Sequence, residues 1–209
     1  MEFYSQHKQD EYVYNRFFKN KKNGVFVDIG ASNGIDLSNS YFFEKELSWS
    51  GICVEPQEFF FKDLSKNRNC VCIQGCVSDF NGVGRFMEIG GYGRMLSGLV
   101  DKYDKKWINV VNNVIESSDS EKNEINVNCH LLNDILIKYD IKKIDFCSID
   151  VEGCELDILK TIDFKKFHFD VFTIENNYSD INVRNFLRER GFDFIEVVGV
   201  DEIYKRKNT

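Results

Sequence analysis

The sequence predicts a single α/β domain whose mostly parallel, seven-stranded sheet carries helices on both faces. Short apolar runs alternate with helical patterns along most of the chain, and this order is typical of parallel strands joined by right-handed crossover helices. The chain has 209 residues, the usual size of one domain, and its single proline and lack of a Gly/Ser-rich linker leave no point of division. Residues 1–209 are therefore treated as one domain.

Five of the predicted strands are runs of β-branched, aromatic or cysteine residues at 25–29, 51–55, 71–74, 144–149 and 171–175. Helical patterns predict helices at 40–48, 59–67, 131–139, 155–161 and 183–190. The alternating stretches 192–198 and 202–206 predict a C-terminal antiparallel hairpin that completes the sheet. A sheet of this kind binds its ligands outside the carboxyl ends of the parallel strands.

Two segments lie outside the repeating pattern. Residues 1–24 precede the first strand and are predicted to form an N-terminal cap. Residues 101–126 are rich in Asn, Ser, Lys and Glu, which predicts an insertion on the surface or a lid over a binding site.

The charge of the chain argues against polyanionic partners. The formal net charge is −7 and the pI is about 5.1, whereas binding to nucleic acid phosphates needs clustered Lys and Arg. Lys102, Lys105 and Lys106 come closest to such a cluster, and we interpret them as a solvated face. No window approaches the roughly 20 apolar residues of a membrane span. Neither nucleic acid nor a membrane is expected as a partner, and a homodimer is one option for the oligomeric state.

The cysteines indicate a reducing compartment. There are seven, an odd number, and most of them, such as Cys53 and Cys147, lie inside apolar runs. Free cysteine in such runs behaves as a small buried hydrophobic residue, and nothing at the N-terminus resembles an export signal. We expect a cytoplasmic protein without disulfides, and no second ligand pair supports a zinc site.

The sequence VDIGASNG at residues 27–34 joins the first strand to a helical pattern. Gly30 and Gly34 allow a sharp turn and leave room for a ligand to approach the backbone. The turn also contains Ala31, Ser32 and Asn33, and Asp28 is placed to accept hydrogen bonds from an ammonium group. An ordinary tight turn between strand and helix is the alternative interpretation.

An acidic residue ends the second strand. Glu55, followed by Pro56, comes about 22 residues after Asn33, and its carboxylate suits the two hydroxyls of a ribose. The dinucleotide pattern G-x-G-x-x-G is absent, because Ala31 and Asn33 do not continue it. The pattern favours a nucleoside ligand without phosphates, such as S-adenosylmethionine, over a nicotinamide dinucleotide.

The third strand is followed by the sequence GCVSD at 75–79, which closes it with Ser78 and Asp79. A carboxylate at this position can accept a hydrogen bond from the exocyclic amine of an adenine. Asp79 and the following Asn81-Gly82 pair are also residues that favour turns, and the two interpretations do not exclude each other.

Carboxylates also follow the fourth and fifth strands. Asp150 and Glu152 follow the fourth strand, and Glu175 and Asn176 end the fifth. Asp150, Glu175 and Asn176 supply the oxygen ligands that Mg²⁺ or another divalent cation prefers, and such a cation would lower the pKa of an acceptor hydroxyl. Alternatively, Glu175 and Asn176 bind the substrate alone or pair with Lys and Arg.

His130 is a candidate general base, because imidazole titrates near neutrality. A lone histidine before an apolar helix is more commonly a structural residue, and we rank that interpretation first.

The chain resembles the FkbM-type methyltransferases over nearly its whole length. The resemblance lies in Tyr4-Ser5-Gln6, Gln9-Asp10, VDIGASNG, Val54-Glu55-Pro56, GCVSD, Ser97-Gly98-Leu99 and, most specifically, SIDVEGCELDIL at 148–159. Lys8 departs from the glycine that relatives commonly carry. The resemblance implies a Rossmann-like fold and S-adenosylmethionine as cofactor.

The resemblance also implies roles for single residues. The methionine part of the cofactor would be surrounded by Asp28, Gly30 and Gly34, the ribose by Glu55, and the adenine by Ser78 and Asp79. The site would be closed by Gln6 and Asp10. Asp150 would lie near the reactive methyl group, and Glu175 and Asn176 would lie near the acceptor. The expected activity is methylation of a hydroxyl on a small molecule, most simply a sugar or glycan. The alternatives are N-methylation of a small molecule or peptide, and a binding module without turnover.

Overall fold

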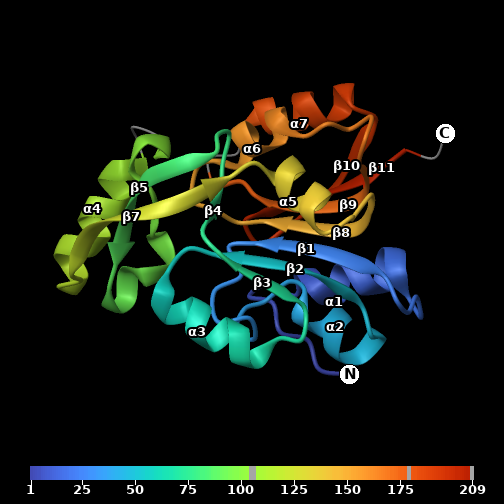
Figure 1. The fold of residues 1–209 in the computed structure, drawn as a ribbon, viewed down its shortest axis with the longest axis horizontal. Coiled ribbons are helices and arrows are strands. Elements are labelled where there is room, and N and C mark those ends of the chain that lie inside the picture. Colours follow the sequence, from blue (N-terminus) through green and yellow to red (C-terminus); the bar gives the residue numbers. More distant parts are fainter. Residues whose placement is uncertain (104–106, 178–179, 208–209) are drawn as a thin grey trace.

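A computed structural model describes residues 1–103, 107–177 and 180–207. Its main sheet has seven strands in the order β10-β11-β9-β8-β1-β2-β3 (Figure 1). The parallel strands are β1 (Val25–Ile29), β2 (Ser50–Glu55), β3 (Val71–Gln74), β8 (Lys143–Ile149) and β9 (His168–Glu175). The C-terminal hairpin consists of β10 (Phe192–Val198) and β11 (Asp201–Arg206), and β11 pairs antiparallel with β9.

Helices cover both faces of this sheet, as predicted (Figure 1). Helices α1 (Gln9–Val13), α2 (Tyr41–Leu47) and α3 (Glu58–Asn67) lie on one face, and α5 (Leu132–Lys138), α6 (Glu155–Thr161) and α7 (Ile181–Glu189) on the other. Neighbouring residues of a strand point to opposite faces, so Phe26 packs under the first group and Val27 under the second. The Rossmann-like α/β prediction is confirmed, and the ends of the predicted elements shift by three residues or fewer.

The core on the second face contains a cluster of aromatic rings around Phe172 of β9. The ring of Phe172 is fully buried, stacks on Phe169 at 4.9 Å between centroids and meets Phe192 edge-on at 5.3 Å. These contacts join the parallel part of the sheet to the C-terminal hairpin.

We expect Phe172→Ala to lower the free energy of unfolding by about 3–5 kcal/mol, because the site cannot collapse around the lost ring. Chemical denaturation measures the change. Phe59→Ala is the control, since that ring is 67% exposed, and it should change stability by less than about 0.5 kcal/mol. Equal losses in the two variants would contradict this account of the core.

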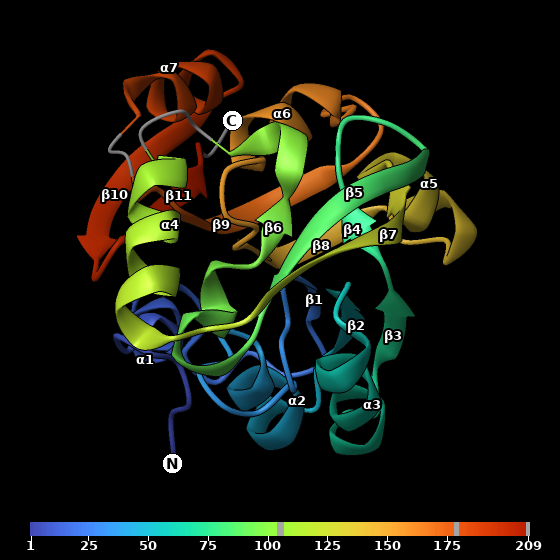
Figure 2. The ribbon, with the colours of Figure 1, turned by 90° about the vertical axis from the view of Figure 1, so that its left-hand side faces the viewer.

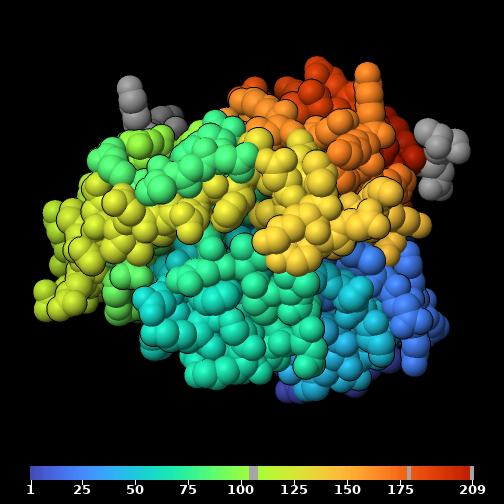
Figure 3. All heavy atoms as spheres, viewed as in Figure 1, coloured from blue at the N-terminus to red at the C-terminus, as the bar shows by residue number. Residues whose placement is uncertain are grey.

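A second, four-stranded sheet lies beside the main one, in the order β4-β7-β5-β6 (Figure 2). Its strands are β4 (Cys76–Val77), β5 (Gly82–Ile89), β6 (Gly98–Leu99) and β7 (Lys122–His130). Helix α4 (Trp107–Ser118) packs on it through Val111 and Ile115, and these elements form the left-hand side of the molecule in Figure 1 and Figure 3. These strands were not predicted, because β7 is largely exposed and rich in polar residues and β5 begins with two glycines in three residues.

The predicted insertion at 101–126 belongs to this second sheet. It includes α4 and the first residues of β7, and Lys105 and Lys106 lie outside the described residues. The short 3₁₀ helix η2 (Gly91–Leu96) connects β5 to β6, and a second one, η3 (Val100–Lys102), follows β6. Residues 76–130 thus form one structural unit that is larger than the predicted insertion.

The N-terminal segment, residues 1–24, contains α1 and a π-helix, η1 (Tyr14–Phe18). Phe3 packs on Phe42 of α2 at 4.4 Å between ring centroids, so the segment covers the same face as α2. All seven cysteines are free thiols. Among the described residues, no helix combines the length and apolar character needed to span a membrane.

Candidate functional site

Two adjoining cavities lie at the carboxyl ends of β1, β2 and β8. With their open mouths they measure about 640 and 520 Å³, within the range of roughly 300–1,000 Å³ for small-molecule pockets. We call the larger the apolar cavity, and its lining includes Val54, Glu55, Pro56, Phe60, Val77, Phe86 and Leu99. We call the smaller the acidic cavity, and its lining includes Gln6, Gln9, Asp28, Asp36, Asn39, Asp150, Glu175 and Asp201. Gly30, Ser32, Met95 and Asp150 line both.

The glycine turn after β1 shapes the wall that the cavities share. Gly30 has a φ of +85°, and a Cβ atom there would lie 1.8 Å from the backbone oxygen of Asp150. Only glycine therefore lets the end of β1 lie this close to the end of β8. Asn33 accepts hydrogen bonds from the backbone N–H groups of Ile35 and Asp36, so it stabilises the turn and does not line a cavity.

Glu55 is a buried carboxyl group on the wall of the apolar cavity. Its Oε2 accepts from the backbone N–H of Ser32 and its Oε1 from that of Gln57, both at 2.9 Å. Burial raises the pKa of Glu55 to about 7 despite these two donors. Each oxygen still has a free lone pair, so the group can accept from two further hydroxyls. This is the fit that the predicted ribose site requires.

The rest of the apolar cavity suits a planar base. Phe60, Val77 and Leu99 come from α3, β4 and β6, so the second sheet closes the cavity over the main one. Ser78 and Asp79 follow Val77 and do not line the cavity. The Ser78 hydroxyl donates to Asp79, and Asp79 pairs with Lys102 at 2.8 Å. Their role toward an adenine stays a prediction.

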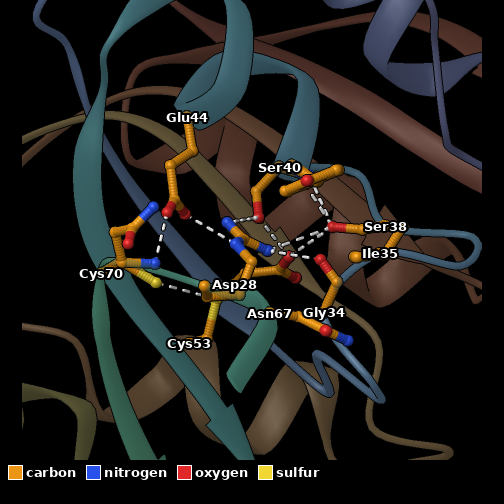
Figure 4. Close-up of polar contacts among 12 residues, drawn as sticks. Asp28, Gly34, Ile35, Ser38, Ser40, Glu44, Cys53, Asn67 and Cys70 are labelled. Atoms are coloured by element: carbon orange, nitrogen blue, oxygen red, sulfur yellow. Dashed lines mark hydrogen bonds and ion pairs between the residues drawn. The ribbon is translucent and has the colours of Figure 1, made fainter. Parts of the chain in front are cut away.

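Asp28 lies on the wall of the acidic cavity and is held by two serines (Figure 4). Its Oδ2 accepts from the hydroxyls of Ser40 at 2.5 Å and Ser38 at 3.4 Å. Burial raises the pKa of Asp28, while the charge of Arg68 and the serine hydroxyls act in the opposite direction. Arg68, at the C-terminal end of α3, was not predicted, because the local sequence does not distinguish it from an arginine in solvent.

Asp150 and Glu175 form a pair of neighbouring carboxyl groups in the acidic cavity, and Asp150 also lines the apolar one. Burial, with the nearby charges of Asp201 and Glu155, raises the pKa of Asp150 to about 7. Burial also raises the pKa of Glu175 well above its ordinary value, and Asp150 adds to this effect. The two groups hydrogen-bond each other, which requires one of them to carry a proton.

The structure places Glu152 beside this pair. One carboxylate oxygen from each of Asp150, Glu152 and Glu175 lies within 4.8 Å of the others. Glu152 has a φ of +58°, in the left-handed region that non-glycine residues adopt at a cost. Asn176 uses its amide within its own turn, where Oδ1 accepts from the backbone N–H of Asp180 and Nδ2 donates to its carbonyl.

Residues of the N-terminal segment reach the acidic cavity. Gln6 and Gln9 line it, and Gln9 Nε2 donates to Asp201 Oδ2 at 2.8 Å. Asp10, in contrast, is fully buried outside the cavity, where it accepts from the backbone of Tyr4 and the hydroxyl of Ser5. Asp201 was not predicted, because only the pairing of β11 with β9 brings it opposite Glu175.

A model of the FkbM methyltransferase domain matches residues 28–194 of this sequence. The chain belongs to the FkbM methyltransferase family. This match confirms the family resemblance and the predicted enzyme class, an S-adenosylmethionine-dependent methyltransferase. No curated protein sequence matches the chain.

Solved structures support the fold of this FkbM-family chain. The FkbM methyltransferase of Methylobacillus flagellatus KT is 12% identical and superposes with a TM-score of 0.51 over 94% of this chain and 50% of its own. The N-terminal domain of human METTL16 is 12% identical, with a TM-score of 0.50 over 97% of this chain and 68% of its own. At these identities the likeness extends to the fold alone.

The family match covers Asp28, Glu55, Asp150 and Glu175 and leaves Asp201 outside it. The FkbM domain thus supplies the shared wall and the carboxyl pair, and the segments before and after it add Gln6, Gln9 and Asp201 to the acidic cavity.

His130 lies behind Gly75, which lines the apolar cavity of this methyltransferase. It ends β7, its backbone oxygen accepts from the N–H of Ser78, and its ring lies next to Gly75. Its ring lines neither cavity, and the structure does not bring it to the carboxyl pair. The role of His130 as a base stays a prediction without geometric support.

Proposed function

We propose that this methyltransferase transfers the methyl group of S-adenosylmethionine to a hydroxyl of a small polyhydroxylated acceptor, such as a sugar or a glycan residue. The observation that carries the proposal is the carboxyl pair of Asp150 and Glu175 at the meeting point of the two cavities. Carboxyl groups whose pKa values are raised are stronger bases than ordinary carboxylates, so this pair can accept the proton that the acceptor hydroxyl loses.

The two cavities suit the two parts of the donor. The apolar cavity receives the adenosine, with the ribose hydroxyls on Glu55 and the base between Phe60 and Leu99. The methionine part extends past Gly30 into the acidic cavity, where Asp28 accepts from its ammonium group. Bound in this way, the donor supplies a methyl group already activated by its sulfonium.

The protein then contributes alignment and proton transfer. The acceptor oxygen is held beside Asp150 in line with the methyl group, and its proton passes to the carboxylate of the pair as the new bond to carbon forms. Met95 lines both cavities.

The charges of the acidic cavity support a neutral acceptor. Five carboxyl groups line it, from Asp28, Asp36, Asp150, Glu175 and Asp201, and its described lining contains no Lys, Arg or His. This field disfavours acceptors that carry a phosphate or carboxylate. It also accommodates a protonated amine, so N-methylation is the second candidate.

A divalent cation is a further part of the proposal. Asp150, Glu152 and Glu175 would hold it, because hard cations prefer several carboxylate oxygens in close proximity. It would act as a Lewis acid on the acceptor hydroxyl. Its binding would also relieve the repulsion within the carboxyl group cluster.

The test is transfer of radiolabelled methyl to a panel of methyl glycosides, matched with glucosamine, glucuronate and glucose 6-phosphate. We expect O-methylation of neutral glycosides at rates at least about tenfold above those of the anionic sugars, because the acidic field opposes the latter. Mass spectrometry of the product distinguishes O-methyl from N-methyl sugars. Each assay is repeated with Mg²⁺ and with EDTA.

Preferred methylation of the anionic sugars would contradict the proposed acceptor class. Methylation only at the amine of glucosamine would favour the second candidate. Unchanged activity in EDTA would remove the cation from the proposal and leave proton transfer to the carboxyl pair.

A further inference from the structure

A buried arginine lies directly behind the wall of the acidic cavity. The side chain of Arg68 has no exposed surface, and its Nε pairs with Glu44 of α2 at 2.6 Å. The guanidinium also lies 5.1 Å from the ring of Phe26 and 5.4 Å from that of Tyr41. Arg68 lines neither cavity, so it does not contact a ligand in either of them.

Arg68 and its neighbour hold the glycine turn from behind. Arg68 Nη1 donates to the backbone oxygen of Gly34 at 3.0 Å, and Asn67 Nδ2 donates to that of Asn33 at 2.9 Å. The side chain of Arg68 also packs where a Cβ of Gly34 would lie, at 2.8 Å from its Cγ. Two consecutive residues at the end of α3 thus bind two consecutive carbonyl groups of the turn.

The same guanidinium reaches Asp28 through serine hydroxyls. Arg68 Nη2 donates to Ser40 Oγ at 3.0 Å, and Ser40 in turn donates to Asp28 (Figure 4 shows Asp28, Ser38, Ser40 and Glu44). Ser40 occupies the N-cap position of α2, yet its hydroxyl makes no capping bond. Ser38 accepts from the backbone N–H groups of Ser40 and Tyr41 instead, which leaves the Ser40 hydroxyl to Asp28.

These contacts require the shape of arginine. The planar guanidinium group donates four hydrogen bonds, and their acceptors belong to Glu44, Gly34, Ser38 and Ser40. A lysine ammonium has too few donors, and lacks the fork geometry, to make all four together. The positive charge also opposes the effect of burial on the pKa of Asp28 and favours its ionised form.

We infer that Arg68 is a positioning residue for the methyl donor, which holds Asp28 and the glycine turn in the arrangement that receives the donor's methionine part. The inference rests on the proposed placement of the donor, because Asp28 lines the acidic cavity and not the apolar one. Loss of Arg68 should therefore weaken contacts to the methionine part and spare those to the adenosine.

The experiment compares two probes by calorimetric titration. S-adenosylhomocysteine has both parts, whereas 5′-methylthioadenosine lacks the amino acid part. In Arg68→Lys we expect the affinity for S-adenosylhomocysteine to fall by about tenfold or more, because charge-assisted hydrogen bonds to the ligand are misplaced. The affinity for 5′-methylthioadenosine should stay within about threefold, which also shows that the variant is folded.

Ser40→Ala is the second variant, since it removes only the hydroxyl between Arg68 and Asp28. This variant should also lower the affinity for S-adenosylhomocysteine and leave the affinity for 5′-methylthioadenosine nearly unchanged. In an Asp28→Asn background, Arg68→Lys should cause little further loss, because the two residues act through the same contact. Lys21→Met is the matched control: it breaks an ion pair with the buried Asp145 near the amino ends of β1 and β8 and should leave both affinities unchanged.

The inference would be overturned if Arg68→Lys and Ser40→Ala lowered the affinities for both probes equally, or lowered neither affinity. Failure of the native protein to bind either probe would instead overturn the proposed donor site.

Discussion

Replacing Glu55 with glutamine is expected to lower the affinity for S-adenosylhomocysteine by about 100-fold, because the negative charge is lost and the amide NH2 group can no longer accept from a ribose hydroxyl. The substitution keeps the size of the side chain, so the wall of the apolar cavity stays in place. Calorimetric titration measures the loss. Gln57→Ala is the control, because Gln57 lines the same cavity and contacts Glu55 only through its backbone N–H.

The same group predicts a pH dependence of binding. Burial raises the pKa of Glu55 to about 7, and the ribose hydroxyls donate to the ionised form. Below pH 7 the free protein carries a proton on Glu55 that binding must displace, so affinity falls by up to about tenfold for each pH unit below 7. Above pH 7 the group is already ionised and affinity levels off.

Titrations between pH 5.5 and 8 test this direction. The native protein should bind more tightly as pH rises, and Glu55→Gln should lose most of that dependence. Affinity that falls with rising pH, or a full pH dependence in Glu55→Gln, would show that Glu55 does not bind the ribose in its ionised form.

Replacing Asp150 with asparagine is expected to lower kcat for methyl transfer by about 100- to 10,000-fold, the usual contribution of a positioned proton acceptor. Glu175→Gln should cause a loss of similar size, because the two carboxyl groups hydrogen-bond each other. The double variant should lose little more than either single one, since residues that act as a unit are not additive.

Initial rates with the best acceptor of the panel measure these losses. Asp36→Asn is the control, because Asp36 lines the acidic cavity and accepts from Asn33 instead of joining the pair. Additive losses for Asp150→Asn and Glu175→Gln would show that the residues act separately. A loss of equal size in Asp36→Asn would indicate a general effect of charge.

Several parts of this protein could be predicted from local sequence. The turn with Gly30 and the carboxyl group of Glu55 each follow directly from a strand that ends in a recognisable pattern. Asp150 and Glu175 could be predicted to lie close together because the carboxyl ends of neighbouring parallel strands meet at one edge, and the structure brings them into a hydrogen-bonded pair.

Other predicted residues lie elsewhere than expected. Asp10 accepts hydrogen bonds from Tyr4 and Ser5 of the preceding loop. Gln9, one residue earlier, donates to Asp201 in the acidic cavity. Similarly, Asn176 completes a turn and Glu152 lies beside the carboxyl pair. Whether a polar side chain reaches the cavity depends here on the direction in which it points, which the composition of a motif does not reveal.

The sequence by itself determined the alternation of strands and helices, the glycine turn and the family, because each depends on residues close together in the chain. Only the tertiary structure decided the second sheet over the apolar cavity, the position of Asp201 opposite Glu175, and the reach of Arg68 to the glycine turn. The physical reason is distance along the chain. Gln9 and Asp201 are 192 residues apart in sequence yet 2.8 Å apart in space, and such contacts follow from the pairing of whole strands and the packing of whole helices.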